Sequence, residues 1–138
     1  MEIFKAVTAI KQPLALYLSR IKAGFPSPAD DYLDKALDLN EHLIKHPAST
    51  FFVKVKGDSM LGAGINSGDI LIVDRSLEPK DKRIVVAVVN GDFTVKRISK
   101  KGEKVSLLAE NDKYPPIEIR DGADFEIWGI VIHVIHSV

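Results

Sequence analysis

The chain has 138 residues, enough for one domain with a modest core, and its hydrophobic content of 46% is ordinary for a globular protein. Its 19 basic and 19 acidic residues cancel. There is therefore no overall electrostatic attraction to nucleic acid, and we expect no direct sequence-specific DNA binding. Cysteine is absent, which excludes disulfides and thiol chemistry.

No apolar run reaches membrane-spanning length, and the first residues lack the charged leader and long apolar stretch of a secretory signal. The apolar run at residues 127–132 is short and stops at His133. We therefore expect a cytoplasmic protein that makes no contact with the membrane.

Residues 1–38 are predicted to form an N-terminal arm, and residues 39–138 a β-rich core. Pro13, Pro26 and Pro28 interrupt any long helix in the arm, because proline lacks an N–H and biases the residue before it toward extended backbone. An extended segment is the form that a protease subsite accepts.

A short helix is predicted after the arm. Asp38 followed by Glu41 resembles a capping box, with the aspartate as N-cap. Leu39 and Leu43 belong to an apolar stripe, and Pro47 blocks continuation of the helix.

From Thr50 onward the sequence predicts strands, because β-branched and aromatic runs alternate with Gly, Asn and Asp clusters. The fold class is therefore mainly β, with a compact and highly curved β core, an extended N-terminal arm and one short helix. The predicted strands are 50–56, 69–74, 84–89, 93–98, 105–109, 117–119 and 125–135.

Asn90-Gly91 lies between two of these runs and predicts a two-residue type I′ hairpin. If Val89 pairs with Asp92, Val85 lies opposite Lys96, and Thr94 and Ile98 flank the lysine on the same face. Apolar neighbours disfavour an ammonium relative to the neutral amine. A lysine at the solvated edge of the hairpin is the alternative.

The segment Gly57-Asp58-Ser59-Met60 precedes this lysine, and Lys96 lies 37 positions after Ser59. A hydroxyl on a turn and a desolvated amine are what a serine hydrolase without histidine requires, because the neutral amine can accept the hydroxyl proton. Ser59 and Lys96 are the candidate catalytic residues.

Other motifs are weaker. His42 and His46 have helical spacing, but no third ligand is signalled, so we expect a solvated helix face and no metal site. The glycine-rich segment 62–68 misses the dinucleotide fingerprint, so we expect no cofactor.

Several segments together resemble the self-cleaving domain of the LexA/UmuD family, and the resemblance covers nearly the whole chain. It implies that Ser59 attacks the Ala23 carbonyl, that Lys96 is the base, and that the Ala23-Gly24 bond is cut. We expect the backbone amides of Asp58 and Ser59 at the serine turn to stabilise the oxyanion. The segments are FVKVKGDSM at 52–60, GDILIVD at 68–74, GDFTVKR at 91–97, GFPSPADDY at 24–32 and GIVIHV at 129–134.

The resemblance further implies the cellular role. Cleavage is expected to be stimulated by RecA on single-stranded DNA in the SOS response, and the protein to be a homodimer. The shortened form is expected to join a UmuC-type DNA polymerase in error-prone translesion synthesis. Two alternatives stay open, a docking module with an idle Ser-Lys pair and a repressor-type peptidase domain.

Overall fold

The computed structural model describes residues 2–6, 13–17 and 33–138. Their contacts form two units, one of residues 1–6 with 46–138 and the other of residues 7–45. Each unit is described by itself below.

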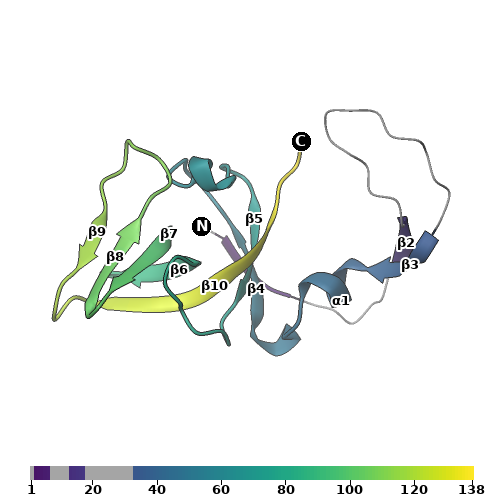
Figure 1. The fold of residues 1–138 in the computed structure, drawn as a ribbon, viewed down its shortest axis with the longest axis horizontal. Coiled ribbons are helices and arrows are strands. Elements are labelled where there is room, and N and C mark those ends of the chain that lie inside the picture. The colour runs from purple at the N-terminus through teal and green to yellow at the C-terminus, as the bar shows by residue number, and fades with distance from the viewer. Residues whose placement is uncertain (1, 7–12, 18–32) are drawn as a thin grey trace. The chain divides into compact units, whose positions relative to one another are not determined.

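The larger unit contains a single antiparallel sheet (Figure 1). Its order is β1-β4-β5-β10-β6-β7-β8-β9. Two short 3-10 turns, Pro47–Ser49 and Leu61–Ala63, accompany it. The strands are β1 (Glu2–Lys5), β4 (Thr50–Lys54), β5 (Ile70–Asp74), β6 (Ile84–Val89), β7 (Asp92–Lys101), β8 (Lys104–Leu108), β9 (Ile117–Ile119) and β10 (Phe125–Ile135).

The last strand, β10, lies in the middle of the sheet and bends along its length (Figure 1). It pairs with β6 and β5, and its register shifts once on each side, between Ile127 and Gly129 and between Val131 and His133. Such bulges increase local twist. A Cβ at Gly129 would lie 2.5 Å from the Cγ1 of Val73, so only glycine lets the strands approach this closely.

The hairpin between β6 and β7 follows from its turn residues. Asn90 and Gly91 have φ values of 49° and 84°, the two positive angles that a type I′ turn requires. Val89 consequently pairs with Asp92, and Val85 pairs with Lys96. The predicted register is confirmed.

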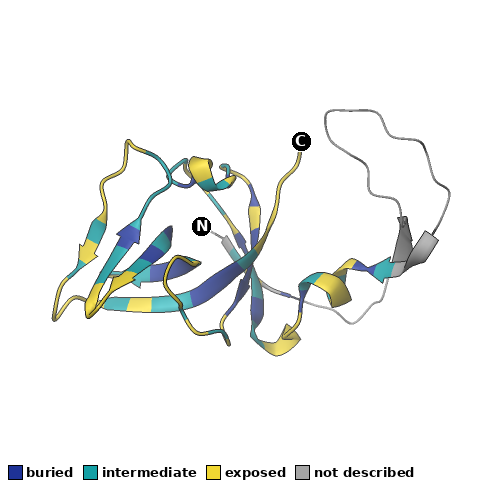
Figure 2. Cartoon of the chain, in the orientation of Figure 1, coloured by how far each residue is buried: buried dark blue, intermediate teal, exposed yellow. Residues whose placement is uncertain are grey.

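Buried side chains form two apolar clusters along the sheet, and burial is concentrated on β5, β6 and the middle of β10 (Figure 2). Met60, which directly follows Ser59, is 2% exposed and packs in the cluster that contains Leu71 and Val86. Val85 and Ile98 belong to the other cluster. Complete burial of a side chain of this size contributes about 1.5–3 kcal/mol.

The smaller unit pairs β2 (Pro13–Tyr17) with β3 (Leu33–Asp38), and α1 (Leu39–Leu43) follows. Asp38 caps the helix as predicted, because its side chain accepts a hydrogen bond from the Asn40 N–H at 3.1 Å. Neither β1 nor this strand pair was predicted. The functional division at residue 38 into an arm and a core stays a prediction.

The mainly β fold class, with a curved β core and one short helix, is confirmed for the described residues. One detail of the helix was wrong, because α1 ends at Leu43 and His46 therefore lies beyond it. The His46 Nδ1 instead lies 2.5 Å from a carboxylate oxygen of the buried Asp74.

Candidate active site

Ser59 lies on a turn that the core and the backbone hold together. Gly57 has a φ of 107°, which disfavours any other residue there, and its N–H donates to the Ser67 hydroxyl at 3.1 Å. On the other side, the buried Met60 anchors the turn in the core, and its carbonyl accepts from the N–H groups of Ala63 and Ile65. The serine side chain therefore projects from a turn that is fixed at both ends.

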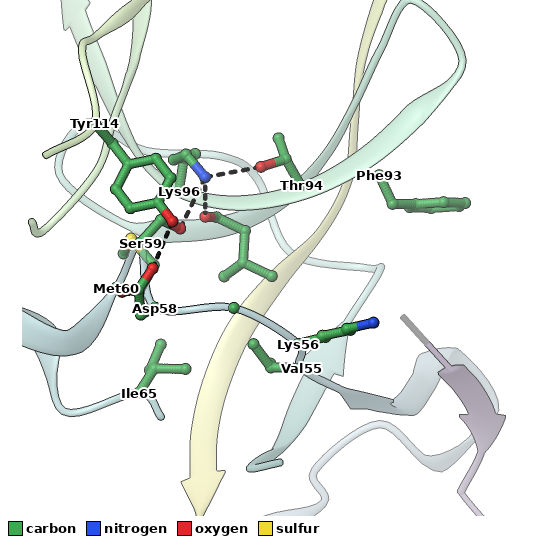
Figure 3. A pocket seen from close by; sticks show the side chains of 12 residues that line it. Val55, Lys56, Asp58, Ser59, Met60, Ile65, Phe93, Thr94, Lys96 and Tyr114 are labelled. Carbon is green, nitrogen blue, oxygen red and sulfur yellow. Dashed lines mark hydrogen bonds between the residues drawn. The ribbon is translucent and has the colours of Figure 1, made fainter. Parts of the chain in front are cut away.

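Lys96 reaches this serine from β7. Its Nζ lies 2.9 Å from Ser59 Oγ, 2.9 Å from Thr94 Oγ1 and 3.1 Å from the Val95 carbonyl oxygen (Figure 3). The predicted candidates are thus brought together, and Thr94 lies beside the lysine as the strand register implied.

The lysine is only 7% exposed. Burial lowers the pKa of Lys96 below the ordinary value of 10.5, because the charged form loses its hydration. Within the part of the chain that the structure describes, Lys96 has no ion pair to offset this loss. The solvated alternative for this lysine is wrong.

A cleft of about 390 Å³ opens over the pair (Figure 3). Its lining combines polar and apolar side chains, and Phe93 and Tyr114 stand in it with 43% and 41% of their surfaces exposed. Such a cleft can exclude water from an extended peptide laid across it. The lining residues are Val55, Lys56, Gly57, Asp58, Ser59, Met60, Ile65, Phe93, Thr94, Val95, Lys96 and Tyr114.

Asp58, on the serine turn, is held by two side chains from the segment after β8. The Tyr114 hydroxyl donates to Asp58 Oδ1 at 2.5 Å, and the Asn111 side-chain amide donates to the Asp58 carbonyl oxygen at 2.9 Å. The hydrogen bond to Asp58, together with the charge of that carboxylate, raises the pKa of Tyr114. Among the described residues, the N–H groups of Asp58 and Ser59 donate to no other group. Both amides are therefore available to a bound oxygen.

Sequence reasoning did not single out Asn111 and Tyr114. The only sequence signal was weak: an Asn-Asp pair of turn formers followed by an aromatic residue in an otherwise polar loop. The other predicted site residues, Ala23 and Gly24, lie outside the described residues.

The described residues contain no group of three side chains suited to a metal ion. None of the helices in the described ranges is long and apolar enough to cross a membrane.

Comparison with known proteins gives a consistent picture. Residues 15–132 match the family model described as Peptidase S24-like. Protein SamA of Salmonella typhimurium is 42% identical over 128 residues, which cover 93% of this chain and 89% of SamA. Protein MucA of Escherichia coli is 41% identical over 135 residues, which cover 96% and 92% of the two chains. The LexA repressor of Shewanella denitrificans is 40% identical over 102 residues, 74% of this chain and 49% of the repressor. The chain belongs to the peptidase S24-like family.

Proposed function

We propose that this protein is a self-cleaving serine endopeptidase that cuts its own chain between Ala23 and Gly24. Ser59 is the nucleophile and Lys96 is the general base. The observation that supports this proposal most strongly is the 2.9 Å contact between Lys96 Nζ and Ser59 Oγ, made by a buried lysine.

The contacts of Lys96 Nζ can be met by the neutral amine that the reaction needs as well as by an ammonium. A neutral amine has two N–H groups and one lone pair, whereas an ammonium has three N–H groups and no acceptor. The two N–H groups can donate to Thr94 Oγ1 and the Val95 carbonyl, which leaves the lone pair for the Ser59 hydroxyl proton. Thr94 thus orients the base.

The reaction then proceeds in balanced steps. Ser59 Oγ attacks the Ala23 carbonyl carbon while Lys96 takes the hydroxyl proton. The backbone N–H groups of Asp58 and Ser59 donate to the resulting oxyanion. Lys96 passes the proton to the Gly24 nitrogen as the peptide bond breaks, and a water activated by Lys96 hydrolyses the ester on Ser59.

The outer edge of β7 offers a place for the extended substrate. From Asp92 to Lys96 this strand pairs with β6 alone, and β8 joins only at Arg97. Along an antiparallel strand, successive residues direct their backbone N–H and C=O groups to alternate sides. The Ile98 N–H donates to the Arg83 carbonyl on the β6 side, so the backbone groups of Phe93 and Val95 face away from β6. A peptide can add to such a free edge as a further strand.

The resemblance to the LexA/UmuD family supports a cellular role in SOS mutagenesis. In this proposal the protein is a cytoplasmic homodimer, and RecA on single-stranded DNA stimulates cleavage by favouring the conformation with the arm docked. The shortened form joins a UmuC-type DNA polymerase for error-prone translesion synthesis.

The test is to incubate the purified full chain at alkaline pH and to measure the masses of the fragments. A product that begins at Gly24, absent from a Ser59→Ala chain treated in parallel, is expected. An intact chain after prolonged incubation, with and without RecA filaments on single-stranded DNA, would instead favour a docking module with an idle Ser-Lys pair.

A further inference from the structure

The segment Glu110–Tyr114, which follows β8, holds the serine turn through three hydrogen bonds, and we call it the turn brace. The Glu110 N–H donates to the Ser59 carbonyl at 2.9 Å. Asn111 Nδ2 donates to the Asp58 carbonyl at 2.9 Å, and the Tyr114 hydroxyl donates to the Asp58 carboxylate. Both sides of the Asp58-Ser59 dipeptide are therefore fixed from one segment.

The bond from Asn111 sets the direction of a neighbouring amide. The Asp58 C=O and the Ser59 N–H belong to one peptide group, which is trans, so they point in opposite directions. Asn111 does not line the cleft, whereas Ser59 does. A carbonyl that points at Asn111 therefore turns the Ser59 N–H away from Asn111 and toward the cleft.

The Asn111 side chain is itself fixed at both ends. Its Oδ1 accepts from the Lys113 N–H at 3.1 Å, while its Nδ2 donates to Asp58. In the same brace, the Glu110 carboxylate pairs with Arg97 at 2.5 Å, and Arg97 is the neighbour of Lys96 on β7. The brace is thus tied to the strand that carries the base as well as to the turn that carries the nucleophile.

We propose that Asn111 is a positioning residue for the cleavage reaction, because its side-chain amide aims the Ser59 N–H at the oxyanion. The inference rests on the proposed function. Asn111 touches neither the substrate nor the reacting atoms, so it acts through the Asp58-Ser59 peptide group.

Two substitutions in the full chain test this inference. Asn111→Ala removes both bonds of the side chain. Asn111→Asp keeps an acceptor for the Lys113 N–H but loses the donor to Asp58, so the brace retains its own turn. Asp112→Asn, at an exposed neighbouring position, is the control for disturbance of the loop. The first-order rate of self-cleavage is measured against pH, and thermal unfolding is followed for each variant.

For Asn111→Ala we expect the plateau rate at high pH to fall by about tenfold to a hundredfold, below the roughly 100-fold to 1,000-fold loss typical when an oxyanion donor is removed outright. The midpoint of the pH profile should stay that of the parent chain, because Lys96 is untouched. Asp112→Asn should cleave at the parent rate. If Asn111→Ala does not fold, Asn111→Asp provides the test, and its plateau rate at high pH should fall in the same way.

If both Asn111 variants reach the plateau rate of the parent chain, the inference is wrong while the proposed function stands. The same holds if Asn111→Ala shifts the midpoint of the pH profile and leaves the plateau rate unchanged. The second result would mean that Asn111 acts on the base. If the parent chain itself does not cleave, the proposed function fails and the inference fails with it.

Discussion

The charge state of Lys96 is expected to control the rate of self-cleavage. Only the neutral amine can accept the Ser59 proton, so the rate without an activator should rise about tenfold per pH unit and level off above the pKa of Lys96. At the ordinary pKa of 10.5, about one lysine in a thousand would be neutral near pH 7.5. Burial lowers this pKa, and each unit of lowering raises the neutral fraction at that pH about tenfold.

Lys96→Arg isolates this effect, since arginine keeps the positive charge but stays protonated throughout the range. The assay follows loss of the full-length chain from about pH 6 to pH 10, with and without RecA filaments on single-stranded DNA. The arginine variant should be inert under every condition. Cleavage of this variant in the presence of filaments, or a parent rate that is flat across the range, would refute Lys96 as the base.

The same burial has a consequence for stability. An unfolded chain keeps Lys96 protonated up to about pH 10.5, whereas the folded chain releases the proton at a lower pH. Between these two values the unfolded state binds more protons, so stability should rise with pH there and fall as pH drops toward the folded pKa. Lys96→Met removes this penalty, which is about 1.4 kcal/mol per unit of pKa difference.

The methionine variant should therefore be inert in cleavage yet more stable than the parent chain near pH 7, and the gain should vanish above about pH 10.5. Urea denaturation at several pH values measures it, with Ser59→Ala as the background for both chains so that cleavage does not interfere. A methionine variant less stable than its background at neutral pH would show that the contacts of the amine outweigh its desolvation.

Three further predictions concern the nucleophile, the cleaved bond and the core. Ser59→Ala should abolish processing while leaving the thermal midpoint nearly unchanged, because it removes one hydroxyl from a half-buried turn. Fragments cut at the same bond in this variant would exclude Ser59 as the nucleophile. Gly24→Val should slow processing strongly, since a β-branched side chain keeps the backbone away from the serine. If mass spectrometry shows that this variant is processed at the rate of the parent chain, the cleaved bond lies elsewhere. Gly129→Ala should destabilise the chain by about 1–3 kcal/mol, because its Cβ would meet the buried Val73 at 2.5 Å; denaturation at the parent midpoint would mean that β10 can shift without cost.

Local chemistry was enough to predict most of the strands and the position of Lys96 within its hairpin. Asn90-Gly91 requires positive φ at two successive residues, which fixes the turn, and the side-chain period of two then places Val85 opposite Lys96. The strands of the core were predicted for the same reason, because their β-branched runs and turn residues lie together in sequence. β1, β2 and β3 were missed because each is a short run without clear alternation whose pairing partner lies elsewhere in the sequence.

Only the tertiary structure brought the two candidate residues to 2.9 Å. That distance depends on β10, the last strand in the sequence, which lies between β5 and β6 and bends through two bulges. The serine turn is also held by the turn brace, whose Asn111 lies 53 positions after Asp58. Pairings over such separations carry no local sequence signal, because their free energy comes from burial and hydrogen bonds that exist only after the chain has closed. The desolvation that lowers the pKa of Lys96 likewise exists only in the folded chain, where the lysine is buried.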